Sequence, residues 1–338
     1  MTRIKSQRLQ FELIRFICIH LSLILLFLTI SCVSIAQQSS SPEDDSFRAL
    51  AQTTSAAARL AAAEDFVANF PESTKRPRVA KLVAQQLTTV RNPEVAVALV
   101  KRARIIFTSP AELEFINSAA LEVYVNANRA DEAFDLAPEV LSGKPGDLKA
   151  LTKMTYLGAQ EARQRKLTHA DTSLKYGWQA IDIIEKDQRP TGMTDSEWAA
   201  VKSTLPELYQ QIVLISLALG KTNEAKTLII KTTELGPKDP SGFALLGRIL
   251  NVEYEKSTAA YQSMPEGDSK QEERRKLDEL LDNIIDAYAR AAGLATGKVR
   301  YQSLLQQMIP DLVAYYKYRH NQSTAGLQEL IDRYRSGQ

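Results

Sequence analysis

Cysteine is nearly absent from this 338-residue sequence, and both copies, Cys18 and Cys32, lie within the first 36 residues. The remainder therefore has no disulfide, no cysteine nucleophile and no zinc–thiolate site. Histidine is also scarce, and the two histidines beyond residue 36, His169 and His320, stand far apart and outside any metal-ligand spacing. We expect no catalytic residue, no metal site and no bound cofactor in this part of the chain.

Glycine and proline are few as well, with 14 and 13 copies, which argues against a loop-rich or all-β chain. Alanine, leucine, glutamate, lysine and glutamine are common instead, and these residues lose little entropy in a helix. From Phe47 onward the apolar residues recur with helical spacing, and alternating strand-like runs are missing. The composition and the spacing together predict an all-α protein.

No excess of either charge is present, because the formal net charge is only +2. Four of the 42 basic residues but only one of the 40 acidic residues lie in residues 1–36, so the remainder is close to neutral. This balance gives no electrostatic support for nucleic acid as a partner. A local basic cluster, Lys75, Arg76, Arg78 and Lys81, has no interleaved aromatics, and we interpret it as solvent-facing surface.

Residues 1–36 carry the three-part pattern of a secretory signal. A net-positive start is followed by an uncharged run from Phe16 to Ala36, which ends in Ser34-Ile35-Ala36, small residues at the positions that a signal peptidase reads. Export to the periplasm or the cell exterior is therefore expected. The polar residues 37–46 are predicted to form a flexible linker to the folded part.

Three fates of the leader remain open. Cleavage after Ala36 would release the folded part. The uncharged run also has about the 20 residues that suffice to cross a bilayer, so it could stay as an anchor. Finally, Leu28 to Cys32 loosely matches a lipidation box, which would place a lipid on Cys32, although Thr29 occupies an aliphatic position. The membrane is thus a partner only through this segment.

Turn residues divide residues 47–338 into about a dozen expected helices with short connections, which is typical of an α-solenoid or a large bundle. A repeat favours the solenoid. Between residues 206 and 250, small, large, glycine and proline residues follow one another at a regular spacing: Tyr209, Ile212, Gly220, Ala225, Ile229 and Pro237, then Phe243, Leu246, Gly247 and Leu250.

This pattern resembles the tetratricopeptide repeat (TPR), a two-helix unit of about 34 residues. The resemblance implies a TPR-like α-solenoid of stacked antiparallel helical hairpins over residues 47–338. Small residues such as Ala225 and Gly247 would let paired helices approach closely, and Gly220 would end a helix in a left-handed cap. The spacing departs from the family near residues 187–200 and 262–275, where we expect insertions. Trp178 is expected to pack in the core.

The resemblance also implies a function, namely an exported scaffold that binds a protein or peptide on its concave face without catalysis. In family terms, helix positions between the packing residues line that face. In this sequence they are Gln210, Leu214, Leu217, Ala244, Arg248 and Asn251. The alternative is a self-associating structural or assembly factor of the cell envelope, anchored by the leader or by a lipid.

Overall fold

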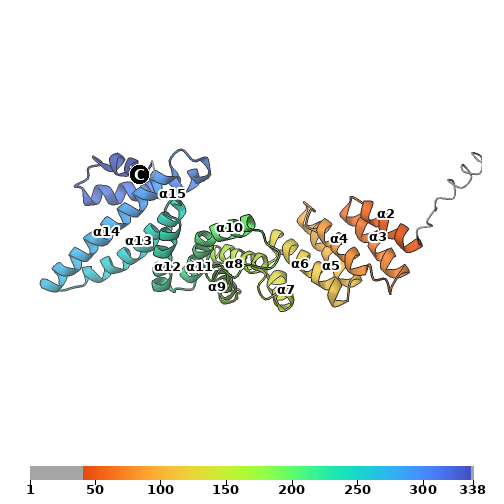
Figure 1. Cartoon of the computed structure of the whole chain (residues 1–338). Coiled ribbons are helices and arrows are strands. Elements are labelled where there is room, and N and C mark those ends of the chain that lie inside the picture. Colours follow the sequence, from red (N-terminus) through yellow and green to blue (C-terminus); the bar gives the residue numbers. More distant parts are fainter. Residues whose placement is uncertain (1–40, 336–338) are drawn as a thin grey trace, which may run out of the picture.

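The computed structural model describes residues 41–335, and helices make up nearly all of them (Figure 1). The chain forms an elongated row of helices, with α2 near one end and the α13–α14 hairpin at the other. The helices are α2 (Pro42–Gln52), α3 (Ala56–Asn69), α4 (Arg76–Leu87), α5 (Pro93–Ile106), α6 (Pro110–Asn126), α7 (Ala130–Gly143), α8 (Leu148–Arg163), α9 (Ala170–Glu185), α10 (Asp195–Ser203), α11 (Leu205–Ala218), α12 (Thr222–Leu235), α13 (Pro240–Gln262), α14 (Asp268–Ala295), η1 (Val299–Tyr301), α15 (Gln302–Arg319) and α16 (Leu327–Arg333).

The helices pair into antiparallel hairpins that stack on one another. Helices α6 and α7, α8 and α9, α11 and α12, and α13 and α14 form the most extensive pairs. Successive hairpins pack through their first helices, α4 on α6 and α8 on α11, as well as through the second helix of one hairpin and the first of the next. The prediction of an all-α, TPR-like solenoid is therefore confirmed by the arrangement of the helices.

The residues that carried the repeat pattern take the expected places. Gly220 has a φ of +75° after the end of α11, which is the left-handed conformation that glycine adopts without strain. Ala225 and Ile229 are fully buried on α12. A side chain on Gly247 would place its Cβ 2.5 Å from the ring of Tyr288, so the absence of one lets α13 and α14 approach closely.

The start of the folded part differs from the prediction. Residues 42–46 belong to α2 rather than to a flexible linker. The Ser41 side chain accepts a hydrogen bond from the amide of Asp44 at 3.1 Å, Pro42 occupies the first turn, and the acidic residues of that turn favour a helix N-terminus. The predicted leader, residues 1–36, lies outside the described residues. Within residues 41–335, no helix combines the length and the apolarity that crossing a bilayer requires.

The two expected insertions differ from each other. Near residues 187–200 the structure has an additional short helix, α10, which Trp198 anchors by donating its indole N–H to Asp187 at 2.7 Å. Around residues 262–275, by contrast, α13 and α14 simply continue as long paired helices, joined by a short turn, and they project from the row (Figure 1). The additional residues therefore lengthen a hairpin there instead of interrupting the stack.

Two further predictions are wrong. Trp178 is 36% exposed, because it lies on the outer side of α9 and contacts Tyr209 only edge to face. Arg76 is not a free surface cation, because it forms an ion pair with the buried Glu112 at 2.6 Å. The neighbouring Arg78 and Lys81 lie over the rings of Phe47 and Phe115.

The interior divides into two separate hydrophobic cores, which we call the N-terminal core and the C-terminal core. The N-terminal core runs from α2 through α12 and ends with Leu245 and Ile249 on one side of α13. The C-terminal core begins with Phe243, Ala244 and Leu250 on another side of α13 and continues through α14, α15 and α16. Helix α13 is therefore the element that both cores share.

Candidate functional site

A cavity of about 610 Å³ lies where the two cores meet, and we call it the junction cavity. Its lining comes from six helices: Ala162 and Arg163 on α8, Leu214 and Leu217 on α11, Thr222 on α12, Leu245, Arg248, Ile249, Asn251 and Val252 on α13, Tyr288 on α14, and Asp311 on α15. Both Leu245 and Ile249 of the N-terminal core and Tyr288 of the C-terminal core face it. The cavity has the size of a ligand site.

The packing of the hairpins explains why the cavity forms at this point. The first helices α8 and α11 pack along each other, whereas α13 packs mainly on α12 and α14 and touches α15 more lightly. Helices α11 and α13 thus lie on opposite sides of an opening instead of closing it. The opening is thus lined mainly by the first helices of successive hairpins.

The six residues that the sequence predicted for partner binding divide into two groups. Leu214, Leu217, Arg248 and Asn251 all line the junction cavity, although they come from two helices separated by α12. The structure therefore brings these four together in one place.

Gln210 and Ala244 do not line the cavity, and their placement there was wrong. Gln210 is only 8% exposed, and its Nε2 donates to Asp239 at 2.5 Å. Ala244 is 2% exposed and packs within the C-terminal core. In both cases the side chain points into a helix interface. More residues of α11 and α13 take part in helix packing than the repeat pattern implies.

Three charged residues of the cavity lack an ion-pair partner among the described residues: Arg163, Arg248 and Asp311. The Nη2 of Arg163 donates to Gln211 Oε1 at 3.0 Å, but no carboxylate neutralises it. Desolvation by the surrounding protein lowers the pKa of Arg163 from its ordinary value, which still leaves it charged at neutral pH. The cavity therefore offers two unneutralised cations and one unneutralised anion to a ligand.

The rest of the lining is apolar or fixed by hydrogen bonds. Val252 is 53% exposed, an unusual degree for an aliphatic side chain in the middle of a helix pair. Asn251 is held from two sides, because its amide donates to Glu255 at 3.0 Å and its carbonyl oxygen accepts from the hydroxyl of Tyr315. Burial raises the pKa of Tyr288, so its hydroxyl remains protonated and can act as a donor. Apolar surface thus lies between fixed polar groups.

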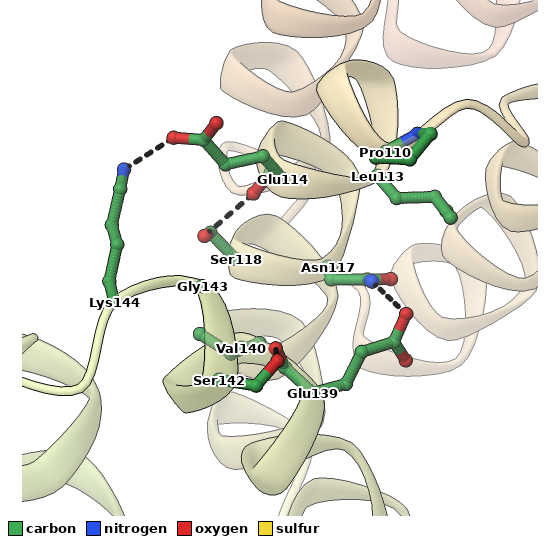
Figure 2. A pocket seen from close by; sticks show the side chains of 10 residues that line it. All are labelled: Pro110, Leu113, Glu114, Asn117, Ser118, Glu139, Val140, Ser142, Gly143 and Lys144. Carbon is green, nitrogen blue, oxygen red and sulfur yellow. Dashed lines mark hydrogen bonds and ion pairs between the residues drawn. The ribbon is translucent and has the colours of Figure 1, made fainter.

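A second cavity, of about 380 Å³, lies between α6 and α7 and has a different character (Figure 2). Its polar side chains pair with each other. Asn117 donates to Glu139 at 2.8 Å, Lys144 forms an ion pair with Glu114 at 2.7 Å, and Arg104 contacts both Asn117 and Glu139. Because these groups are already satisfied, this cavity offers little to a charged ligand.

No group of three or more side chains able to ligate a metal occurs within residues 41–335. His169 stands at the N-cap of α9, where its ring stacks on Phe134 and its Nε2 lies 2.9 Å from Asp131. Gly297 has a φ of +77° in the left-handed turn that follows the end of α14 at Ala295.

Sequence reasoning missed Arg163, Val252 and Asp311 as cavity residues. Arg163 and Asp311 lie on α8 and α15, where the repeat pattern is too weak to set the register of the helices. Val252 lies two residues beyond the window, 206–250, in which the pattern was clear.

No family model matches this chain, and no curated protein matches it either. Solved structures with a related arrangement include YrrB, described as a TPR protein with an unusual peptide-binding site, at 20% identity over 67% of this chain and 93% of that one, with a TM-score of 0.41. A TPR protein from Parabacteroides merdae is 9% identical over 82% and 91% of the two chains, with a TM-score of 0.38. PilF from Pseudomonas aeruginosa is 14% identical over 68% and 97%, with a TM-score of 0.35.

Proposed function

We propose that this protein is a binding scaffold that holds an extended segment of another protein in the junction cavity. One observation carries the proposal: first helices of successive hairpins line an open, partly apolar cavity whose charged side chains form no ion pair within the described chain. Curved stacks of helical hairpins characteristically use such a surface to bind extended chains. The repeat pattern of residues 206–250 points to the same surface from the sequence side.

The cavity suits binding of a chain segment better than binding of a small cofactor. It is bounded by partly exposed aliphatic side chains of α11 and α13, and its polar groups come from five different helices. An extended peptide buries alternate side chains and can contact groups that are this widely distributed.

We further propose that the scaffold works in the cell envelope. The leader pattern of residues 1–36 supports this setting. The lack of cysteine beyond residue 36 is compatible with an oxidising compartment, because no thiol there can be oxidised. Mass spectrometry of the N-terminus of the protein from its native host tests the proposal, and an N-terminus at Gln37 would support cleavage and export.

Site-specific photo-crosslinking tests the binding function. A photoreactive phenylalanine analogue replaces Val252, which is 53% exposed inside the cavity. The matched control places the analogue at Ile105, which is 78% exposed on α5 and outside the cavity. We expect a discrete crosslinked species in cells from position 252 and none from position 105.

Two results would contradict the proposal. One is the absence of any crosslink from position 252, and the other is the same set of products from both positions. A further variant, Leu214→Arg, places a long charged side chain in the cavity. We expect it to abolish the crosslink while the melting temperature changes little, since Leu214 is only partly buried.

A further inference from the structure

The unpaired charges of the junction cavity follow a fixed order along the stack. Arg163 stands on α8, the aliphatic Leu214 and Leu217 follow on α11, Arg248 stands on α13, and Asp311 stands on α15. The contacts of α8 with α11, of α12 with both α11 and α13, and of α13 with α15 establish this order in space. A ligand that crosses the first helices therefore meets positive, apolar, positive and negative groups in succession.

Many charged side chains elsewhere in the described chain form ion pairs with neighbouring residues. Lys226 on α12 pairs with Glu253 on α13 at 2.6 Å, and Arg319 on α15 pairs with Asp282 on α14 at 2.8 Å. Both pairs flank the cavity without facing it. Arg163, Arg248 and Asp311 line the cavity itself, and none of them forms an ion pair within residues 41–335.

An unneutralised guanidinium next to apolar surface favours a carboxylate, because a charge-assisted hydrogen bond is strongest where water is partly excluded. Asp311 has the opposite preference and favours a cationic side chain. A uniformly anionic ligand, such as a nucleic-acid backbone, would meet repulsion at Asp311 and would leave the aliphatic wall of α11 uncovered.

Helix packing sets the spacing between these contacts. Neighbouring packed helices lie about 8–10 Å apart, and an extended chain advances about 3.3 Å per residue. Helices α11 and α13 lie across the opening and are not packed neighbours, so the path from α8 across α11 to α13 spans at least about five residues. The shorter path from α13 to α15 spans about three.

We propose that the junction cavity selects an extended peptide with a defined order of charges. The peptide carries one acidic residue opposite Arg163, apolar residues opposite Leu214 and Leu217, a second acidic residue opposite Arg248, and a basic residue opposite Asp311. This inference rests on the proposed binding function and adds the chemistry of the partner to it.

Selection from a phage-displayed library of random 12-residue peptides on the full chain tests the charge order. Three variants are used beside the wild type: Arg163→Glu with Arg248→Glu, Asp311→Lys alone, and the control Arg91→Glu with Lys175→Glu. Arg91 and Lys175 are exposed cations that line no part of the cavity and form no ion pair within residues 41–335. The control thus changes the net charge as much as the arginine variant does.

We expect the wild type to enrich peptides with two acidic residues at least about five positions apart, apolar residues between them, and a basic residue beyond the second acid. The double variant Arg163→Glu with Arg248→Glu, the arginine variant, should no longer enrich acidic peptide residues. Asp311→Lys should select an acidic peptide residue where the wild type selects a basic one. The control should select the same peptides as the wild type. A synthetic peptide with the wild-type consensus should bind the arginine variant about tenfold more weakly. Exchanging its acids for amides should weaken binding to the unaltered protein by a similar factor, so this readout does not depend on the folding of any variant.

Three results would overturn the charge order. The wild type could enrich peptides without acidic residues, the arginine variant could still prefer acidic peptide residues, or Asp311→Lys could still select the basic peptide residue. Enrichment of purely apolar peptides would overturn this inference alone and leave the binding function intact. The failure of the wild type to enrich any peptide would contradict both.

Discussion

The N-terminal core and the C-terminal core are built in different ways. The N-terminal core is a continuous series of short hairpins, and its first part is fixed by a buried ion pair between Arg76 and Glu112. The C-terminal core uses two long helices, α13 and α14, that pack closely where Gly247 meets Tyr288, and α14 packs closely on α16 where Gly293 meets the backbone of Ile331. In the N-terminal core each short hairpin packs on the next one, whereas the two long helices of the C-terminal core pack mainly on each other.

This difference explains the position of the junction cavity. Helix α13 belongs to both cores and cannot satisfy both packing modes along its whole length. Its close packing on α14 draws it towards the C-terminal core and leaves an opening on the side of α11. The proposed binding site is thus a product of the change from one mode of packing to the other.

The largest expected effect is the loss of the buried ion pair in the N-terminal core. Glu112 is 1% exposed and accepts hydrogen bonds from Arg76 Nε at 2.6 Å and from the amides of Thr108 and Ser109, both at 3.1 Å. We expect Glu112→Ala to lower the free energy of unfolding by about 3–5 kcal/mol, because it removes the carboxylate that neutralises Arg76 and leaves two amides without an acceptor. Urea denaturation followed by circular dichroism measures the change.

The control for this variant is Glu114→Ala on the same helix. Glu114 is half-exposed and pairs with Lys144 on the surface, so its loss should cost less than about 1 kcal/mol. Hydrogen exchange should show that Glu112→Ala leaves α14 and α15 protected. Equal costs for the two variants would show that the N-terminal core does not depend on the buried pair.

A smaller effect is expected from overpacking the C-terminal core. The Cβ of an alanine at position 247 would come within 2.5 Å of the Tyr288 ring, which is itself buried. Gly247→Ala should therefore cost about 1–3 kcal/mol in urea denaturation. Gly143→Ala, at the end of α7, is the matched control, because nothing lies within 4 Å of the added carbon and alanine favours a helix. Destabilisation by both substitutions to the same extent would contradict the role of close packing.

Acid should loosen the N-terminal core selectively. Burial alone would raise the pKa of Glu112, but the hydrogen bonds from Arg76 and Ser109 outweigh it and hold the pKa below the ordinary value. A group with a lowered pKa stabilises the fold above its ordinary value of about 4.3, and this contribution is lost as the pH falls through the lowered pKa. Hydrogen exchange at decreasing pH should show α4 and α6 losing protection in this range, and Glu112→Gln should remove the pH dependence. An unchanged pH dependence in that variant would assign the effect to other groups.

The smallest effect on stability is expected at the junction. Arg163→Glu with Arg248→Glu should change the free energy of unfolding by no more than about 0.5 kcal/mol for each site, because both side chains are exposed and neither forms an ion pair with the described chain. Thermal melting measures this. A loss of several kcal/mol would mean that the two arginines hold the cores together, and would contradict their assignment to a ligand.

The sequence predicted the fold well where the repeat residues were clear. Gly220, Ala225 and Gly247 have the roles that their sizes implied. The linker prediction failed at residues 42–46 because Ser41 and Pro42 form a helix start that the polar composition concealed. The prediction that Trp178 packs in the core failed because helical spacing alone does not say which side of a helix faces a neighbour, and this side chain is exposed.

The partner-binding site stays a prediction. Four of its six residues, Leu214, Leu217, Arg248 and Asn251, line one cavity, because the repeat register placed them on the same side of α11 and α13. Arg163 and Asp311 come from helices without a clear repeat, and their proximity depends on the change in packing at α13, which no local pattern encodes.

Methyl NMR of the full chain, with labelled leucine and valine, tests the central claim most directly. The probe is a synthetic peptide with the charge order proposed for the junction cavity. We expect its titration to shift the methyl resonances of Leu214, Leu217 and Val252, and to leave those of Leu113 and Val140 in the cavity of Figure 2 unchanged. Shifts confined to Leu113 and Val140, or no shifts at Leu214, Leu217 and Val252, would contradict the assignment of the binding site to the junction of the two cores.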